Sequence, residues 1–318
     1  MADATKSVQK AFETQGVKYP SWSRRLTRRI IVLRPINWIA LQLFTRLPLN
    51  RWTKRFPAVG KKGILRLTSG DKVEFMRAQK CSIARQLFWS NGNFFWEQDK
   101  IAISTFEALV KSVNLFIDIG AYTGLYSLVA ARTNQSCRVF AYEIIPENIL
   151  VLYENVFHND LVERIAPRLC GLSDRNGSIV MPFSLDFGLL ETGIGIDWEF
   201  KSGVSIPLRT LDKLHSDIAE RFMMKIDVEG LEPEVFIGGR CTIERLLPDI
   251  ICEVLVGART VSSLERQLRP LGYHFYHITR RGLMEKSNIV PTEHERDWLF
   301  SVRCKSELIE IGVDIWYE

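Results

Sequence analysis

Strand-like and helical segments alternate through the middle of this 318-residue chain, and this alternation constrains its fold more than any other feature. Apolar, strand-like runs cover residues 114–120, 138–144, 164–172, 223–228 and 249–254. Segments with helical spacing, roughly 124–133 and 146–158, separate the first three runs. Strands that alternate with helices of this length predict an α/β fold, in which helices cover both faces of a mostly parallel sheet.

Further elements are expected on either side of this core. The pattern predicts a hairpin over about 64–75, turning at residues 69–71, and a helix around 101–113. After Ser173 we expect extra hairpin strands, before helical spacing resumes in the stretch 208–220. Two closing strands are predicted within 272–279 and 296–303.

Charge is unevenly distributed along the chain. Between Glu13 and Asp71 there are 13 Lys and Arg residues and no acidic residue, whereas the whole chain carries a net charge of only +5. Residues 22–33 have the spacing of a basic amphipathic helix. Two readings stay open for residues 18–66: cations that simply face water, or peripheral contact with an anionic membrane or an acidic acceptor.

The sequence favours a cytoplasmic protein. The polar N-terminus lacks the layout of a signal peptide, and Arg34, Pro35 and Arg46 interrupt the most apolar run, so no transmembrane helix is expected. The six cysteines are scattered without a C-x-x-C pair, which indicates neither a disulfide framework nor a zinc site.

The turn after the first of these strands is the main candidate for a ligand site. In the stretch DIGAYTG, Gly120 and Gly124 allow a tight turn, and the amides that open the following helix favour a negative group. Asp118 lies near the end of an apolar strand and needs a hydrogen-bond donor there. The spacing differs from the dinucleotide fingerprint, because Tyr122 fills the position of its second glycine. This departure disfavours NAD, and the Walker A pattern is absent as well.

A second acidic residue follows at the tip of the next strand. Glu143 can accept two hydrogen bonds from a ribose diol. Together with Asp118 it calls for a nucleoside that carries an amino-acid-like tail instead of a pyrophosphate, and S-adenosylmethionine is such a molecule. The alternative to ligand binding is a structural role for each carboxylate. Asp118 would then cap the turn, and Glu143 would be an exposed strand end.

Six stretches, in this order, resemble the FkbM family of S-adenosylmethionine-dependent methyltransferases. They are FIDIGAYTGLYSL, VFAYEIIPENILVLYENVFHN, CGLSDRNG, LRTLDKL, MKIDVEGLEPEVFIGG and PDIICEV. The resemblance covers roughly residues 94–300. It implies a Rossmann-like class I methyltransferase domain at 94–318, preceded by a basic helical and hairpin extension at 1–93.

The resemblance also implies roles for individual residues. Asp118, Gly120 and Gly124 would form the cofactor loop, with Thr123 near the methionine carboxylate and Glu143 on the ribose hydroxyls. Ser173 and Asp174 would lie near adenine, and Asp227 and Glu229 would face the methyl group and the acceptor. The family usually has Asn where this chain has Tyr122, which also belongs to the predicted cofactor loop.

A hydroxyl acceptor needs a base to remove its proton. Asp227, Glu229 and a Lys225 with a lowered pKa are the candidates, in that order, although Lys225 also fits a structural ion pair. Glu253 is either a carboxylate of the acceptor cleft or a helix cap. No metal is expected.

Together these features predict an enzyme that methylates a hydroxyl of a sugar, a glycolipid or a secondary metabolite. The alternative is a catalytically silent, methyltransferase-like binding module that docks on a membrane or glycan through its basic head. No nucleic-acid partner is expected.

Overall fold

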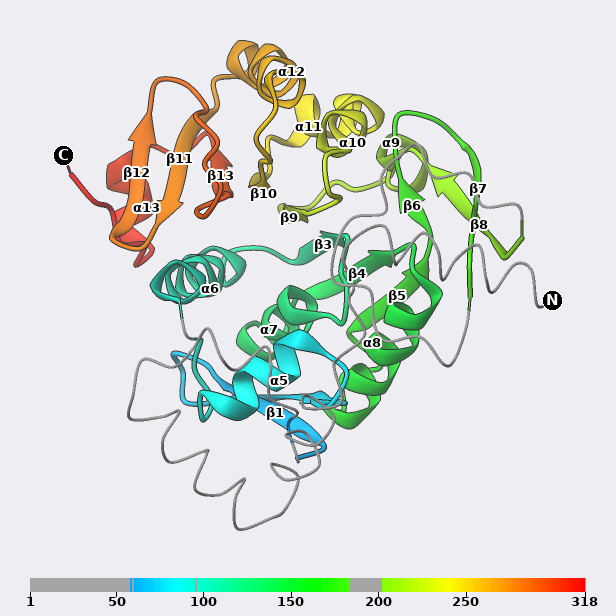
Figure 1. Cartoon of the computed structure of the whole chain (residues 1–318). Coiled ribbons are helices and arrows are strands. Elements are labelled where there is room, and N and C mark those ends of the chain that lie inside the picture. Colours follow the sequence, from blue (N-terminus) through cyan, green and yellow to red (C-terminus); the bar gives the residue numbers. More distant parts are fainter. Residues whose placement is uncertain (1–57, 59, 95, 184–201, 318) are drawn as a thin grey trace.

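An eight-stranded sheet forms the centre of the molecule (Figure 1). The computed structural model describes residues 58, 60–94, 96–183 and 202–317. From one edge to the other, the strands are β5 (Ile165–Leu169), β4 (Arg138–Glu143), β3 (Leu115–Ile119), β9 (Phe222–Ile226), β10 (Asp249–Glu253), β13 (Asp297–Ser301), β11 (His274–Thr279) and β12 (Gly282–Lys286).

The five strands from β5 to β10 are parallel. Strand β13 runs antiparallel to β10 and β11 and lies between them, although it follows β11 in the chain. The strand order reverses beside β3, which has β4 on one side and β9 on the other. Ligands of open α/β sheets bind at the carboxyl ends of the strands where this reversal occurs. The predicted Rossmann-like, mostly parallel α/β fold is confirmed.

Helices cover both faces of the sheet (Figure 1). One face carries α6 (Glu97–Val110), α7 (Leu125–Thr133), α8 (Pro146–His158) and α13 (Lys305–Glu310). The other face carries α9 (Leu211–Leu214), α10 (Glu232–Gly238), α11 (Arg240–Leu246), α12 (Ala258–Leu268) and the 3₁₀ turn η1 (Arg269–Leu271). Each face therefore has its own hydrophobic core.

The alternation of side chains along β3 decides which core each residue enters. Phe116 packs on the α7 side, whereas Leu115, Ile117 and Ile119 pack on the opposite side. Asp118, two residues after Phe116, points to the same face of the sheet. Lys225 of β9 is paired with Asp118 in the parallel ladder. Both polar side chains therefore project toward α7.

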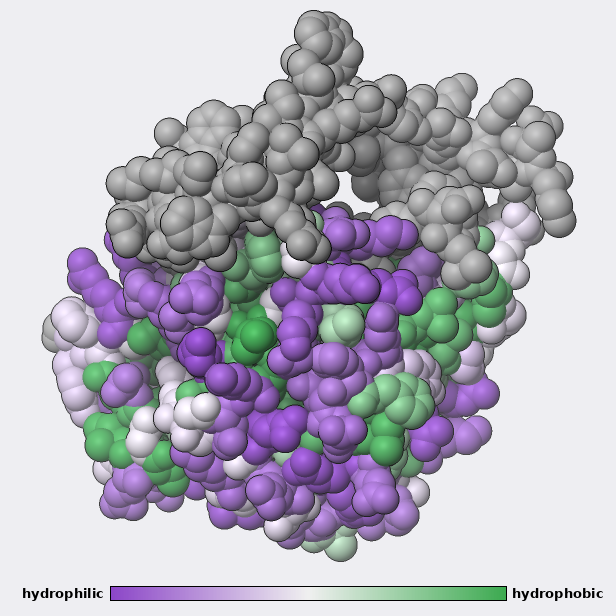
Figure 2. Space-filling model, turned by 90° about the horizontal axis from the view of Figure 1, so that it is seen from below, coloured by the Kyte–Doolittle hydropathy of each residue, from purple (hydrophilic) through white to green (hydrophobic). Residues whose placement is uncertain are grey.

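The residues before 94 share the core of the α7 face. The predicted hairpin is present as β1 (Lys62–Arg66) and β2 (Lys72–Met76), and α5 (Ser82–Trp89) follows it. Leu65, Phe75 and Leu87 of this extension belong to the same buried cluster as Leu128 of α7 and Leu152 of α8. Seen from below, the described surface is mostly hydrophilic, with hydrophobic residues scattered in small groups (Figure 2).

A small three-stranded sheet lies beside the main one, in the order β6 (Gly171–Leu172), β8 (Val204–Arg209), β7 (Gly177–Met181). The antiparallel pair β7 and β8 matches the hairpin strands expected after Ser173. The helical spacing expected over 208–220 is realised only at Leu211–Leu214. Leu208 and Arg209 instead complete the β8 ladder, and the Thr210 side chain caps the short helix by accepting from the Lys213 amide.

Several expectations fall outside the described residues, namely the amphipathic helix at 22–33 and all of the basic segment before residue 58. In the part of the chain that the structure does describe, no helix is long and apolar enough to cross a membrane.

Candidate active site

The glycine turn lies at the carboxyl end of β3, where the strand order reverses. The amides of Gly120 and Ala121 both donate to the carbonyl of Tyr142, at 3.0 and 2.9 Å, which ties the turn to β4. Gly120 (φ +80°) and Gly124 (φ +90°) adopt the left-handed conformation that glycine tolerates best. A β-carbon at Gly120 would overlap the Asp227 carbonyl oxygen, and one at Gly124 would overlap Leu152.

Tyr122 is also left-handed, with a φ of +50°, which disfavours a bulky side chain. Asn tolerates this conformation better, and this accounts for the Asn that the resembling family usually has here. The stretch DIGAYTG therefore forms the tight turn that its glycines predict, although Tyr122 is unfavourable in a left-handed conformation.

Glu143, the last residue of β4, holds the turn in place. One carboxylate oxygen accepts from the Tyr122 amide at 2.7 Å and the other accepts from the Ile145 amide at 2.8 Å. The residue is 5% exposed, and this burial raises the pKa of its carboxyl to about 7, although the two amides oppose the shift. A carboxylate can accept about four hydrogen bonds, so each oxygen keeps acceptor capacity for a hydroxyl.

Asp118 makes contacts within the fold. Its carboxylate accepts from the Ser127 amide at 3.0 Å and from the Ser127 hydroxyl at 2.6 Å, and Ser127 lies in the first turn of α7. These are the contacts of a helix-capping carboxylate, and they replace the side-chain cap that Gly124 cannot provide. Burial raises the pKa of Asp118 to about 6, against the stabilising effect of Ser127 and of the Lys225 ammonium.

Thr123 faces the extension. The side chain is fully buried, and its hydroxyl lies 3.4 Å from the sulfur of Cys81. Its carbonyl oxygen accepts from the Asn155 side-chain amide at 2.8 Å. The Thr123 hydroxyl therefore faces the Cys81 sulfur inside the fold, and its place near a methionine carboxylate stays a prediction.

Ser173 and Asp174 follow β6. The Ser173 amide donates to the Arg209 carbonyl at 2.9 Å, and its hydroxyl donates to Asp174 at 3.1 Å. The Ser173 carbonyl packs so closely on Gly238 that a β-carbon there would overlap it. Both residues therefore lie beside α10, the helix that follows the turn after β9.

Lys225 is the buried centre of a charged network at the other end of the site. Its side chain is 3% exposed, and its ammonium lies 3.5 Å from Asp227 and 3.3 Å from Asp297. The ring of Tyr126 lies beneath it, at 5.4 Å. Burial opposes the charge, but the two carboxylates outweigh it and raise the pKa of Lys225 well above its ordinary value. Lys225 is thus held as a cation. This fits the structural ion pair that the sequence allowed and does not fit a base with a lowered pKa.

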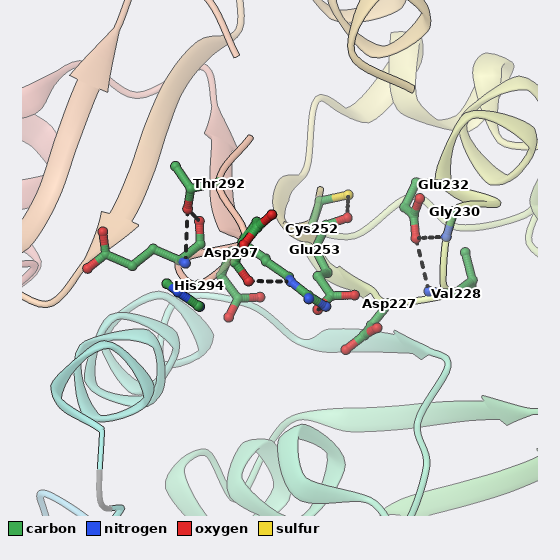
Figure 3. Close-up of polar contacts among 12 residues, drawn as sticks. Asp227, Val228, Gly230, Glu232, Cys252, Glu253, Thr292, His294 and Asp297 are labelled. Carbon is green, nitrogen blue, oxygen red and sulfur yellow. Dashed lines mark hydrogen bonds and ion pairs between the residues drawn. The ribbon is translucent and has the colours of Figure 1, made fainter. Parts of the chain in front are cut away.

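Asp227, Glu253 and Asp297 lie close together at the carboxyl ends of β9 and β10 and the start of β13 (Figure 3). Because β13 is antiparallel to β10, its first residue, Asp297, pairs with the last residue of β10, Glu253. Asp297 was not among the candidates from the sequence. Its position next to Glu253 depends on β13 entering the sheet out of chain order.

Glu229 joins this group from a turn. Strand β9 ends at Ile226, and Glu229 is left-handed, with a φ of +56°. One oxygen each of Asp227, Glu229 and Glu253 lie within 4.8 Å of one another. Burial, followed by the charge of Asp227, raises the pKa of Glu253 to about 8. Hard cations bind such oxygens, but acidic groups this close are common without an ion, and the cluster alone does not define a metal site.

An open hollow of about 510 Å³ lies just beyond the carboxyl end of β10. It is lined by Leu255, Val256, Glu293, His294 and Arg296. Arg296 lies 3.6 Å from Glu253, and so links the hollow to the charged network.

The order of the sheet and the glycine turn beside Asp227 define a Rossmann-like class I methyltransferase. The sequence model of the family described as "Methyltransferase FkbM domain" matches residues 118–275, about half of the chain. These residues form a methyltransferase domain of the FkbM family, which confirms the resemblance noted in the sequence. No curated protein matches the chain significantly.

Several solved structures are similar to this one. Methyltransferase FkbM from Methylobacillus flagellatus is 15% identical with a TM-score of 0.43, and the match covers 70% of this chain and 56% of that protein. An S-adenosylmethionine-dependent O-methyltransferase from Thermotoga maritima is 16% identical with a TM-score of 0.35, over 81% and 82% of the two chains. These likenesses are distant, and the fold assignment rests on the sheet itself.

Proposed function

We propose that this methyltransferase uses S-adenosylmethionine to methylate a hydroxyl group of a sugar, glycolipid or secondary metabolite. The observation that carries the proposal is the contact between the two halves of the site. The glycine turn is clamped by Glu143 on one side and packs on the Asp227 backbone on the other. A nucleoside held at Glu143 would therefore extend across the turn toward Asp227.

The residues present suit this cofactor. Glu143 keeps acceptor capacity for the ribose hydroxyls, and the first turn of α7 offers a positive helix end to a carboxylate. Ser173 and Asp174 offer a hydroxyl and a carboxylate for the adenine edge. When bound, the cofactor supplies an electrophilic methyl group on a positively charged sulfur.

Asp227 is the base in this proposal. Its side chain is 40% exposed, whereas Lys225 is buried beside it, so Asp227 is the member of the pair that an acceptor can reach. The Lys225 ammonium holds the carboxylate in place, and Asp227 would take the proton of the acceptor hydroxyl as the methyl group transfers. Glu229 and Glu253 flank it and offer further acceptors to the hydroxyls of a polyol.

Calorimetric titration with S-adenosylhomocysteine tests the cofactor. The wild-type chain should bind near the micromolar range, about −8 kcal/mol. Glu143→Gln keeps an acceptor oxygen for only one of the Tyr122 and Ile145 amides and should weaken binding at least tenfold, whereas Glu244→Gln in an exposed ion pair with Arg240 should leave it unchanged. Absence of binding to the wild-type chain would overturn the proposal.

We also propose that the basic segment 18–66 makes a peripheral contact with anionic membrane on the cytoplasmic side. The proposal rests on its 13 cations between Glu13 and Asp71. Sedimentation with vesicles that contain phosphatidylserine should capture the full chain at low salt. A variant with Arg24, Arg25, Arg28 and Arg29 changed to Gln should be captured less, and equal capture would refute the contact.

A further inference from the structure

Two asparagines, one in α8 and one directly after it, hold the N-terminal hairpin against the methyltransferase domain. Asn155 accepts from the Met76 amide at 2.7 Å. Asn159, one helical turn later, accepts from the Glu74 amide at 2.9 Å and donates to the Glu74 carbonyl at 2.7 Å. Both asparagines are buried. They therefore satisfy backbone groups of β2 that would otherwise lack partners in the interior.

Only Asn155 also reaches the cofactor loop. Its side-chain N–H donates to the Thr123 carbonyl at 2.8 Å, so one fully buried amide joins β2 to the glycine turn. The remaining side-chain bond of Asn159 goes to the Asn155 carbonyl of α8, at 2.8 Å. Both asparagines thus bind the hairpin, but only Asn155 also binds the cofactor loop.

A second contact from the extension ends on the same loop residue. Cys81 caps the N-terminus of α5, accepting from the Ala84 amide, and its sulfur lies 3.4 Å from the Thr123 hydroxyl. The extension therefore contacts the side chain of Thr123 directly and its carbonyl through Asn155. Thr123 is 0% exposed, and every contact that fixes it comes from inside the fold.

We propose that the hairpin and α5 are a working part of the cofactor site, and that Asn155 is the positioning residue that couples them to the loop. This inference rests on the proposed use of S-adenosylmethionine. The Thr123 carbonyl belongs to the peptide that joins Thr123 to Gly124, so its bond to Asn155 fixes the orientation of that peptide. Gly124 has a φ of +90° and would otherwise allow the peptide to rotate.

The orientation of this peptide matters for the ligand. The Gly124 amide donates to the Ala121 carbonyl at 2.7 Å and closes the turn, and the Tyr122 amide holds Glu143. A rotated 123–124 peptide would break the bond that closes this turn and leave the segment that carries the Tyr122 amide less firmly held against Glu143. Cofactor affinity therefore depends on Asn155, although the Asn155 side chain itself is not placed to contact the cofactor.

Matched substitutions at the two asparagines test the inference. Asn155→Leu and Asn159→Leu each remove the bonds to β2 and leave buried backbone groups unpaired, so both should lower the melting temperature. Titration with S-adenosylhomocysteine, at a temperature where each variant is folded, should show at least a tenfold weaker affinity for Asn155→Leu. Asn159→Leu should bind within twofold of the wild-type chain.

Hydrogen exchange of the loop gives an independent readout. Amides of residues 120–126 should exchange faster in Asn155→Leu and at the wild-type rate in Asn159→Leu. Should Asn155→Leu fail to fold, Asn155→Asp replaces it, because Asp keeps the oxygen for the Met76 amide and, when ionised, lacks the donor for Thr123. Equal affinities in the two series would overturn the coupling, whereas a wild-type chain that does not bind would overturn the proposed cofactor instead.

Discussion

The α-carbon of Gly120 lies against the carbonyl oxygen of Asp227, so closely that a β-carbon on residue 120 would overlap it. Gly120 begins the turn after β3, and Asp227 follows β9, which is the neighbouring strand. The Asp227 amide also donates to the Ile119 carbonyl at 2.9 Å. The two most distinctive motifs of the sequence are thus one packed unit, which joins the proposed cofactor loop to the proposed base.

We expect Gly120→Ala to be severely destabilising. The substitution combines a left-handed backbone with a backbone clash, and should lower the free energy of unfolding by about 3–5 kcal/mol. Gly70→Ala is the control, since Gly70 has a φ of +89° in the hairpin turn with open space around it. It should cost only about 1–2 kcal/mol. Urea denaturation measures both, and equal losses would mean that the contact with Asp227 is not tight.

Cofactor binding should tighten as the pH rises from 6 to 8. In the free protein burial raises the pKa of Glu143 to about 7, so its contribution to stability is present below pH 4.5 and is lost as the pH rises through 7. Ribose hydroxyls donate to the ionised carboxylate and favour it, so binding releases a proton. Titration of S-adenosylhomocysteine should show an affinity gain of up to about tenfold over this range.

Glu143→Gln should flatten that pH profile. Asp118, whose pKa is raised to about 6, would add a smaller change in affinity near pH 6, and this change should remain in the variant. A profile that is unchanged in Glu143→Gln would show that another group carries the proton.

Lys225→Met should cost about 3–5 kcal/mol of unfolding free energy, because it leaves Asp227 and Asp297 facing each other without their cation. Adding Asp297→Asn should recover part of the loss. Arg240→Gln, in an ion pair whose Arg240 side chain is 72% exposed, should leave the free energy of unfolding nearly unchanged. Thermal unfolding of the four proteins checks this order, and a mild Lys225→Met phenotype would contradict it.

Asp227→Asn tests the proposed base. Asp227 is 40% exposed, but it is one of the two carboxylates beside the buried Lys225 ammonium, so the substitution should lower the free energy of unfolding by about 1–3 kcal/mol and leave the chain folded. Methyl transfer should fall by about 10²–10⁴-fold with the loss of the base. Transfer of a labelled methyl group to acceptor sugars measures the rate, and activity that survives would move the role of base to Glu229 or Glu253.

His215 should make the protein sensitive to acid. It is buried on the other side of the sheet, 2.7 Å from the Tyr142 hydroxyl, and burial lowers its pKa to about 4. Between that value and the ordinary 6.5 the unfolded chain binds more protons, so stability falls as the pH drops from 6.5 to 4, by at most about 3 kcal/mol.

The measurement is urea denaturation of the wild-type chain and His215→Asn at pH 7.5 and pH 5. The raised pKa values of Asp118, Glu143 and Glu253 act in the opposite sense, and they are common to both proteins. The stability difference between the two proteins should therefore shrink at pH 5. A constant difference would mean that His215 keeps an ordinary pKa in the fold.

The sequence predicted the parallel half of the sheet closely, because each of those elements carries its own local signal. The segment 146–158 is the observed helix α8, begun by Pro146, and the run 138–144 is β4. By contrast, only Leu211–Leu214 is helical in the expected segment 208–220. Its first two residues, Leu208 and Arg209, form strand β8 and pair with the neighbouring strands β6 and β7 instead.

The geometry was predictable where residues follow the ends of neighbouring parallel strands, and not where elements meet out of chain order. Gly120, Glu143 and Asp227 converge as expected from strand ends alone. Asp297 was missed, since only the antiparallel insertion of β13 brings it to Lys225. Asn155 was missed too, because its partners Met76 and Thr123 lie 79 and 32 residues away and no local pattern marks such bonds.

The insertion of β13 between β10 and β11 has a consequence for the order of assembly. A ribosome makes β11 and β12 before residues 297–301, so until then β10 and β11 cannot take their final places on either side of β13. Lys225 gains its second carboxylate only when this strand arrives. The proposed acceptor end therefore receives its last strand later in synthesis than the proposed nucleoside end, whose strands β3, β4 and β5 are made first.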